Sequence, residues 1–294
     1  MSAASMWQLS LIVPRTAVPL CEDVLAEHCL AVSQQLTDDG YITLLGLTAG
    51  PPAAELAVAL ALAAAAAGIA APEIAIEPVG ERNWLAENQE SFTPFRVRRF
   101  FIHQQDDPTP APADAVALAV DAGLAFGSGR HASTAGCLLA LGTLHRRLPE
   151  GPALDLGCGS AILAIAASRV LHRPVVASDI DPVAVRIAAE NARRNGVGAW
   201  IRTVTADGCA HPLIRAHAPY ALLFANILAR PLQRLARAAV RHTAPGGTVI
   251  LAGFVVGDAR RVLAVYHALG CRLQRQIVID GWATLVLRRS RAAD

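Results

Sequence analysis

The sequence contains no lysine. All 26 basic residues are arginine, and 24 acidic residues oppose them, so the formal net charge is +2. Without a lysine amine the chain cannot form a Schiff base with a carbonyl substrate or use lysine as a general base. A charge so close to neutral gives no electrostatic indication of a nucleic-acid or membrane partner, and we expect neither.

Paired cysteines and clustered histidines are also missing. The six cysteines are scattered without a C-x-x-C pair or a signal peptide ahead of them, so we expect reduced thiols in a cytoplasmic protein. The nine histidines form no H-E-x-x-H motif, and we expect no metal site. The apolar run Ala54–Ala70 is short for a membrane span, contains Glu55 and is mostly alanine, which predicts a soluble helix.

Strand and helix patterns alternate in the first third of the chain. Strands are predicted at WQLSLIV (7–13), YITLLGL (41–47) and EIAIEPV (73–79). A helix is predicted over 21–36, where Leu25, Cys29 and Val32 share one stripe, and the alanine-rich run is a second helix. This order predicts a small α/β sandwich of the split βαβ (ferredoxin-like) kind over residues 1–95, with two helices on one face of a sheet.

A proline- and acid-rich stretch, QDDPTPAPAD, marks a linker or long surface loop. We place the linker at 96–115 and a second domain at 116–294. Strand-like runs alternate with helical stretches through this domain, which predicts a doubly wound α/β fold with a seven-stranded, mostly parallel sheet. The runs are VALAV (116–120), PALDLG (152–157), PVVASDI (174–180), WIRTVTAD (200–207), YALLFANI (220–227), GTVILAG (247–253) and ATLVLRR (283–289).

A glycine turn, DLGCG (155–159), follows the strand predicted at 152–157. Ligands of such folds bind beyond the carboxyl ends of the strands, and Gly157 and Gly159 allow a ligand to approach the main chain closely. A dinucleotide fingerprint would need glycine or alanine at position 162, where this sequence has Ile162. The turn therefore favours S-adenosylmethionine, which has no pyrophosphate, over NAD.

Acidic residues end the next two predicted strands. Asp179 and Asp181 come about 20 residues after the turn, where a carboxylate accepts hydrogen bonds from ribose hydroxyls. Asp179 is the better ribose ligand, while Asp181 stands directly before Pro182, where it is either a ligand or a helix cap. Asp207 closes the following strand, where it is either an adenine-binding residue or a plain surface acid.

Asn226 lies near the end of the strand predicted at 220–227, in the sequence ANILARPL. Some amino-directed methyltransferases carry an Asn/Asp-Pro-Pro-aromatic turn here, whose ring stacks on a flipped base. Ile227, Leu228 and Ala229 follow instead, so the stacking ring is absent. This argues against a nucleobase substrate and for an amine on a flexible side chain.

These motifs resemble the bacterial ribosomal protein L11 methyltransferases of the PrmA type. The resemblance lies in DAGLAFGSGRHASTAGCLLAL, LDLGCGSAILAIAA, SDIDPVAVRIAAENARRNGV and ANILARPL, in this order, and in NWLAENQESFTPFRV before the linker. It covers nearly the whole chain and implies a protein N-methyltransferase that uses S-adenosylmethionine. The N-terminal domain would dock the ribosomal protein, and the C-terminal domain would methylate lysine and N-terminal amines. A monomer without direct nucleic-acid specificity is expected.

The resemblance also implies which residues bind the cofactor. The family's ligands fall on Thr134, Gly157, Asp179 and Asn226, beside the turn residue Gly159 and Asp207 named above. We expect Asn226 to be the catalytic residue. Two family positions differ here: Ala132 replaces a common proline, and Ala161 replaces the third glycine of the turn, where its methyl group would crowd the cofactor.

Several roles stay open at the sequence level. His131 is either a general base or a residue that shapes the cofactor pocket. Phe126, Trp84 and Phe92 either contact ligands or pack between domains. Two further functions remain as alternatives. One is a methyltransferase acting on another protein or a small molecule, and the other is a binding module that has lost the cofactor.

Overall fold

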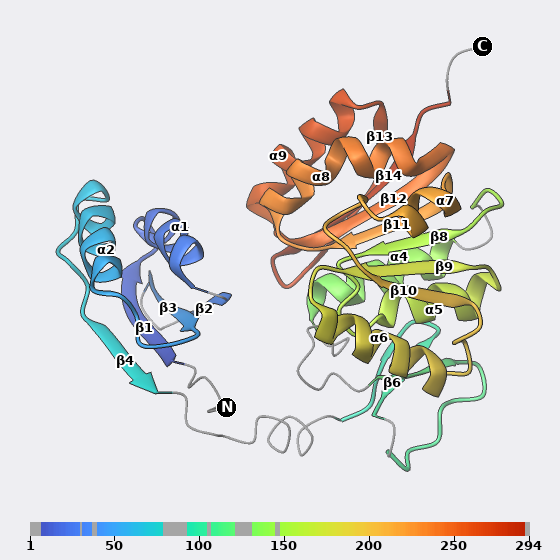
Figure 1. Ribbon diagram of the computed structural model, residues 1–294, viewed down its shortest axis with the longest axis horizontal. Helices are drawn as coiled ribbons and strands as arrows, with labels where there is room; N and C mark the ends of the chain where they lie inside the picture. Colours follow the sequence, from blue (N-terminus) through green and yellow to red (C-terminus); the bar gives the residue numbers. More distant parts are fainter. Residues whose placement is uncertain are drawn as a thin grey trace. The chain divides into compact units, whose positions relative to one another are not determined.

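The computed structural model describes residues 7–29, 31–36, 40–78, 93–104, 107–120, 131–144 and 148–291. The chain divides into two compact units, Met1–Trp84 and Leu85–Asp294. Each unit has its own hydrophobic core, and no described core residue of one belongs to the core of the other. The two units are described separately below (Figure 1).

The N-terminal unit is a four-stranded antiparallel sheet with two helices. Its strand order, β2-β3-β1-β4, places β3 between β1 and β2, which is the split βαβ arrangement. Alternate residues of β1 and β3, such as Leu9 and Leu44, pack against both helices in one core. The predicted sandwich is therefore confirmed. Its elements are β1 (Trp7–Pro14), α1 (Val18–His28), β2 (Ala31–Leu36), β3 (Tyr41–Thr48), α2 (Ala54–Ala66) and β4 (Ile74–Pro78).

The helix predicted over 21–36 is wrong in its second half. Helix α1 ends at His28, and Ala31–Leu36 is strand β2, paired antiparallel with β3. Leu25, Cys29 and Val32 do pack against one core, but from a helix, its C-cap and a strand. Pairing with β3 satisfies the backbone groups of this segment and overrides the helical spacing of three apolar residues.

Helix α2 is the alanine-rich segment. Leu56, Leu60, Ala63 and Ala64 form its buried side, whereas Val58 and Leu62 are exposed. The helix predicted in this segment is confirmed. Among the described residues, no helix combines the length and the apolar content that crossing a membrane requires.

The C-terminal unit is built on a seven-stranded sheet of order β10-β9-β8-β11-β12-β14-β13. Neighbouring strands from β10 to β12 are parallel, and β14 is antiparallel to both β12 and β13. The chain moves outward from β8 to β10 and then returns to the other side of β8, so the topological switch point lies between β8 and β11. The strands are β8 (Ala153–Leu156), β9 (Val175–Asp179), β10 (Ile201–Thr205), β11 (Tyr220–Asn226), β12 (Thr243–Val255), β13 (Cys271–Ile279) and β14 (Trp282–Arg289).

Helices cover both faces of this sheet (Figure 1). On one face lie α4 (Ala132–Leu144), α5 (Ile162–Leu171) and α6 (Pro182–Arg194), and on the other α7 (Pro212–His217), α8 (Ala229–His242) and α9 (Val256–Ala268). Successive strand residues alternate between the two cores: Phe224 packs with α4 and α5, and Leu223 packs with α8 and α9. The predicted doubly wound fold is confirmed.

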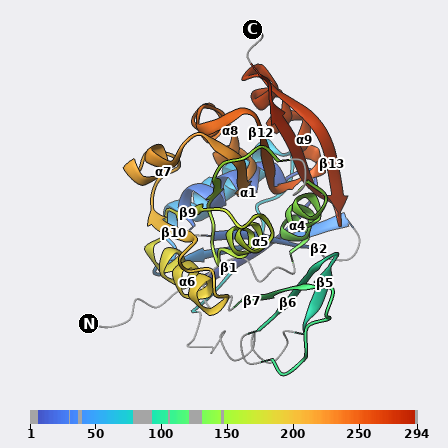
Figure 2. The ribbon, with the colours of Figure 1, turned by 90° about the vertical axis from the view of Figure 1, so that its right-hand side faces the viewer.

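A small third sheet packs on the α4–α5 side of the C-terminal unit (Figure 2). It consists of β5 (Phe95–Val97), β6 (Phe100–His103) and β7 (Val116–Ala119), in the order β5-β6-β7. Phe100, Ile102 and Leu118 share a core with α4 and α5. The predicted linker 96–115 thus contains strand β6 and most of β5, because its apolar residues have a helix surface to pack on.

Two strands of the C-terminal unit differ from the prediction. The run at 116–120 forms β7 of the small sheet instead of a strand of the large one. The seventh strand of the large sheet is β13, which the sequence did not indicate. Strand β13 lies at the sheet edge and most of its residues are exposed, so CRLQRQIVI lacks the apolar pattern of a buried strand.

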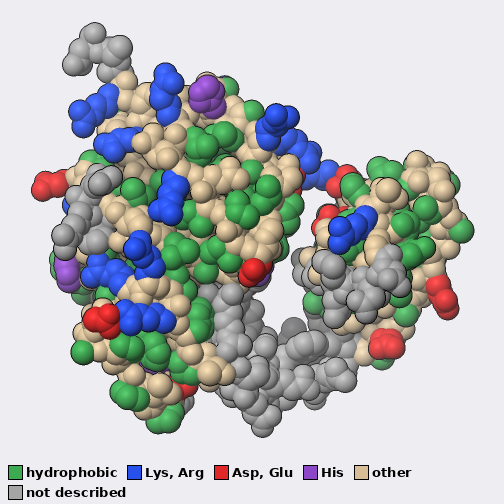
Figure 3. Space-filling model, turned by 180° about the vertical axis from the view of Figure 1, so that it is seen from behind, with side chains coloured by type: hydrophobic (Ala, Val, Ile, Leu, Met, Phe, Trp, Pro, Cys, Tyr) green, Lys and Arg blue, Asp and Glu red, His purple; other side chains and the backbone are tan. Residues whose placement is uncertain are grey.

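The surface of the C-terminal unit carries dispersed positive charge. On the face shown in Figure 3, arginine side chains stand among hydrophobic and neutral ones. The six cysteines of the whole chain have free thiols, and five of them are buried.

Candidate active site

Four neighbouring strands bring the predicted site residues to one edge of the large sheet. The glycine turn follows β8, Asp179 is the last residue of β9, Asp207 comes two residues after β10, and Asn226 is the last residue of β11. These strands are adjacent and parallel in the order β10-β9-β8-β11. Their carboxyl ends therefore meet where ligands of doubly wound folds bind.

The glycine turn has a left-handed backbone. Gly157, Gly159 and Ala161 have φ values of +69°, +51° and +63°, a region that favours glycine. The N–H groups of Gly157 and Cys158 both donate to the carbonyl of Ser178, at 2.8 and 2.9 Å. The turn is thus fixed to the end of β9.

The methyl group of Ala161 lies inside the protein. Ala161 is fully buried and belongs to the core between the sheet and α5. Its N–H donates to the carbonyl of Cys158 at 2.8 Å. The cost of alanine at this position therefore lies in its left-handed backbone, because the methyl group itself packs with core residues.

Asp179 is held by backbone donors on both carboxylate oxygens. Its Oδ2 accepts from the N–H of Gly159 at 2.9 Å, and its Oδ1 accepts from the N–H of Asp181 at 3.1 Å. A carboxylate oxygen accepts more than one hydrogen bond. Asp179 thus has a fixed orientation and acceptor capacity left for a ligand.

Asp181 and Asp207 have different surroundings. Asp181 is the N-cap of α6, and its Oδ1 accepts from the N–H of Val183 at 2.8 Å. Of the two roles that the sequence left open for Asp181, the structure shows the helix cap. Asp207 is exposed directly after Ala206, whose N–H donates to the carbonyl of Asp179 at 2.8 Å. Asp207 therefore lies at the same edge of the sheet.

Asp155 is a buried carboxylate beneath the turn, and sequence reasoning gave it no role. It is 1% exposed, and its Oδ2 accepts from the N–H of Ala164 in the first turn of α5 at 3.0 Å. Burial raises the pKa of Asp155 to about 7; the bond from Ala164 opposes the shift, and the charge of Asp179 adds to it. The signal in the sequence was an acid inside the apolar run ALDL.

Asn226 is joined to Thr134 of α4. The Asn226 Nδ2 donates to the Thr134 Oγ1 at 3.2 Å, and Thr134 is 1% exposed. The Asn226 Oδ1 is buried, and among the described residues it has no hydrogen-bond partner. A buried acceptor without a donor costs free energy unless a ligand supplies one.

Comparison with known proteins shows the family of the chain. The family model of the ribosomal protein L11 methyltransferases (PrmA) matches residues 22–290. The chain belongs to this family. It is therefore an S-adenosylmethionine-dependent methyltransferase, as the sequence motifs predicted.

Individual relatives agree with the family model. The ribosomal protein L11 methyltransferase of Rhodopseudomonas palustris is 42% identical over 231 residues, which is 78% of each chain. That of Rhizobium meliloti is 44% identical over 213 residues, or 72% of this chain and 73% of the relative. The crystal structure of the ribosomal protein L11 methylase from Lactobacillus delbrueckii subsp. bulgaricus is similar with a TM-score of 0.61 and 26% identity. It covers 68% of this chain and 100% of that one.

Sequence reasoning missed Gly253, which together with Gly157 lies against the residue after Asn226. Ile227 follows it, and a Cβ on Gly157 would lie 2.3 Å from the Ile227 Cγ2. A Cβ on Gly253, whose φ is +92°, would lie 2.6 Å from the Ile227 carbonyl oxygen. Gly157 and Gly253 thus make room for the segment after β11. The signal for Gly253 was a glycine at the end of the apolar run GTVILAG.

His131 caps the start of α4 three residues before Thr134. Its Nδ1 lies 2.8 Å from the Ser133 Oγ and accepts from the Ser133 N–H at 3.3 Å. Its ring packs edge-on against Trp282, with ring centroids 4.2 Å apart. Burial lowers the pKa of His131, which favours the neutral ring. These contacts support a shaping role.

The other predicted contacts lie outside the described residues. This applies to Trp84, Phe92, Phe126 and positions 127–130 of the loop before α4.

Proposed function

We propose that this enzyme transfers methyl groups from S-adenosylmethionine to amines of ribosomal protein L11, and that the amine is held at Asn226. The names of the curated relatives support this substrate, and so does the missing aromatic ring after Asn226, which a flipped base would need. The acceptor would be a lysine side chain or an N-terminal amine.

The residues at the carboxyl ends of strands β8–β11 suit S-adenosylmethionine. Asp179 has two oriented oxygens with spare acceptor capacity for ribose hydroxyls. Gly157 is half-buried in the turn at the carboxyl end of β8, and its left-handed backbone shapes the turn against which the cofactor would lie. Gly159, Thr134 and Asn226 would complete the site, and Asp207 would accept from the adenine amino group. When bound, this cofactor supplies a methyl group on a positively charged sulfur.

The acceptor amine must be neutral and correctly placed to react. An alkyl amine has a pKa of about 10.4 in water, so at neutral pH it carries a proton that blocks its lone pair. A buried site disfavours the charged form, and an amide oxygen accepts a hydrogen bond from the neutral amine without adding a negative charge. Holding the nitrogen in line, at about 3 to 3.5 Å from the methyl carbon, lowers the barrier further.

The unpartnered Oδ1 of Asn226 is the observation that carries the proposal. Its amide nitrogen is already engaged by Thr134, so the oxygen is the atom left for a ligand. An N–H of the substrate amine would satisfy this buried acceptor and orient the nitrogen lone pair away from it. No dedicated base is needed for this step, which agrees with the shaping role of His131.

Substitution of Asn226 tests the assignment. Asn226→Ala removes the acceptor, and methylation of purified L11, followed by mass spectrometry, should fall by roughly 10²-fold. Thr134→Val, which deletes the hydroxyl that orients the amide, should lower the rate less, and the matched variant Thr134→Ser should restore it. Circular dichroism checks that each variant is folded. Unchanged turnover of Asn226→Ala would refute the role of this residue.

Two experiments separate the proposal from its alternatives. Incubation with labelled S-adenosylmethionine and a total ribosomal extract should label one band, that of L11; label elsewhere would point to another substrate. Calorimetry with S-adenosylhomocysteine should show binding, because an enzyme of this class binds its product. A binding module without cofactor would give no heat.

A further inference from the structure

An open hollow of about 510 Å³ lies between the β5–β6 hairpin and the last turn of α4. Three arginines and one carboxylate are among its described lining residues, whose formal charges add up to +2. It shares no lining residue with the site at the ends of β8–β11. Its lining residues are Arg96, Arg98, Arg99, Asp114 and Gly142.

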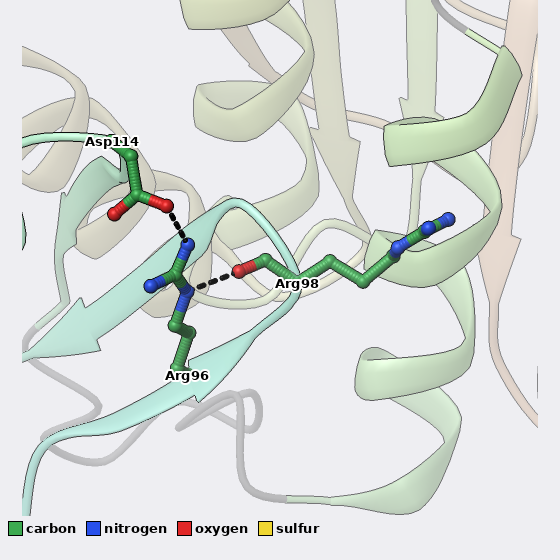
Figure 4. Close-up of polar contacts among 3 residues, drawn as sticks. All are labelled: Arg96, Arg98 and Asp114. Carbon is green, nitrogen blue, oxygen red and sulfur yellow. Dashed lines mark hydrogen bonds and ion pairs between the residues drawn. The ribbon is translucent and has the colours of Figure 1, made fainter.

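Arg96 is held in place on one side of the hollow (Figure 4). Its Nη2 donates to the Asp114 Oδ2 at 2.5 Å, and its Nε donates to the carbonyl of Arg98 at 2.5 Å. Both side chains of the ion pair are largely exposed, at 42% and 72%, so the pair contributes little to folding. What it does provide is a guanidinium with a fixed plane, which loses less entropy when an anion binds.

Arg98 occupies a turn position that disfavours arginine. Its φ is +50°, in a two-residue hairpin turn where glycine, asparagine or aspartate is normally found. Its side chain is exposed and extends from the turn toward α4 (Figure 4). In the described parts of the chain, no carboxylate pairs with it. A strained backbone that carries an unpaired charge into a hollow indicates a binding role.

Gly142 forms the opposite wall without being required by packing. A Cβ at this position would have the Phe100 Cε2 as its nearest neighbour, at 3.7 Å, which is an ordinary contact. Glycine in a helix is less stable than alanine. Two locally unfavourable residues therefore line the same hollow: Arg98 adds a positive charge, and Gly142 adds no side chain that would fill it.

We propose that this hollow binds phosphoryl groups of an anionic ligand. Arginine forks bind both phosphates and carboxylates. Figure 4 shows Arg96 and Arg98 pointing in different directions. Side chains that diverge in this way would contact separate phosphoryl groups of a ligand that carries several, whereas a single carboxylate has two oxygens in one plane and Asp114 already pairs with Arg96. The phosphoryl groups would come from a free polyphosphate or from an RNA backbone.

Calorimetry on the full chain at low salt tests this site, with inorganic pyrophosphate, a short single-stranded RNA and a glutamate-rich peptide as probes. Arg98→Gly suits the left-handed turn and removes the charge, so it should fold at least as well as the natural chain, as a thermal melt will show. We expect it to weaken pyrophosphate binding at least tenfold. Arg260→Gln, which removes an equal charge from an exposed position on α9, should leave binding within about twofold.

The outcomes divide cleanly. Tighter binding of RNA than of pyrophosphate, with a strong salt dependence, would assign the phosphoryl groups to a nucleic-acid backbone; the reverse order would assign them to a free polyphosphate. The proposal is overturned if neither binds, if Arg98→Gly binds like the natural chain, if Arg260→Gln loses as much affinity, or if the glutamate-rich peptide binds most tightly.

Discussion

The carboxyl group of Asp155 lies in a strand whose four residues are all buried. Only one backbone donor, the N–H of Ala164, is recorded for it among the described residues. A charged carboxylate in such a place is costly, which is why its pKa rises from 3.8 to about 7. The folded chain therefore holds a proton here that the unfolded chain releases at a much lower pH.

This proton makes stability depend on pH in a defined direction. Between pH 3.8 and about 7 the folded state binds more protons at Asp155 than the unfolded state does. The contribution of Asp155 to the free energy of unfolding should thus fall as the pH rises through this window, by at most about 1.4 kcal/mol per pH unit, and level off above it. Urea unfolding of the natural chain and of Asp155→Asn at several pH values measures the effect.

The comparison isolates one group because other carboxylates titrate equally in both proteins. Asparagine at 155 keeps an oxygen for the Ala164 N–H and cannot ionise. The natural chain should therefore lose stability relative to Asp155→Asn as the pH rises from 4 to 7. A difference between the two proteins that stays constant over this range would show that Asp155 is already ionised in the folded state.

Among the secondary-structure elements, α5 has a left-handed residue at both ends. Ala161 is its N-cap, and His172, with φ +52° and ψ +46°, is its C-cap. The N–H of His172 donates to the carbonyl of Ser168 at 2.9 Å. Helices often end on such a residue, and glycine is preferred there because it has no Cβ to crowd the carbonyl.

His172→Gly should stabilise the protein. His172 is exposed, so its side chain buries no apolar surface that the change would lose. We expect the free energy of unfolding to rise by about 0.5 to 1 kcal/mol, measured by thermal or urea unfolding. His267→Gly, at an exposed position inside α9, is the matched control and should destabilise by about 0.5 kcal/mol. Destabilisation in both variants would contradict the capping argument.

Elements buried by the main sheet were predictable because their sequences are continuous apolar runs. Strands β8, β9 and β11 match their predicted positions to within one residue at each end, and the run predicted at 247–253 lies inside the longer strand β12. Strands β2 and β13 lie at sheet edges. An edge strand forms backbone hydrogen bonds to a partner strand on one side only, so its side chains need not form a continuous apolar run. Their mixed polar and apolar sequences are equally compatible with a helix or a loop. The strand conformation is therefore determined by pairing with the neighbouring strand.

Only part of the candidate site could be predicted from the sequence. Asp179 and Asn226 could be placed because each ends a recognisable strand a fixed distance beyond the glycine turn. The support from Thr134 to Asn226 joins residues 92 positions apart. The close approach of Ile227 to Gly157 and Gly253 likewise depends on how strands and helices pack. Such contacts leave no local pattern in a sequence.

At the scale of the whole molecule, the two units have independent cores. Leu9, Leu11, Leu25 and Leu60 are among the buried residues of the N-terminal core, and the large sheet has one core on each face. Asn195 ties the small sheet to α6: its Nδ2 donates to the Ala119 carbonyl at 2.6 Å, and its Oδ1 accepts from the Ala119 N–H at 2.9 Å. The small sheet thus belongs with the C-terminal unit.

Residues 85–294 should therefore fold without the N-terminal unit. We expect this fragment to unfold cooperatively on heating and to bind S-adenosylhomocysteine like the full chain, because the proposed cofactor residues all lie within it. If the N-terminal unit docks the substrate, methylation of L11 should fall by roughly 10²-fold, since the substrate is no longer held near the site. Full activity of the fragment would refute the docking role, and failure to fold would contradict the independence of the cores.

The positive charges visible in Figure 3 are all guanidinium groups, because the chain has no lysine. A guanidinium keeps its proton at any physiological pH and offers no lone pair like that of a free alkyl amine. An enzyme that methylates lysine has no lysine side chain to methylate on its own surface or on another copy of itself. In a labelling gel, lysine methylation therefore cannot label the band of the enzyme, so this band gives no lysine-methylation background.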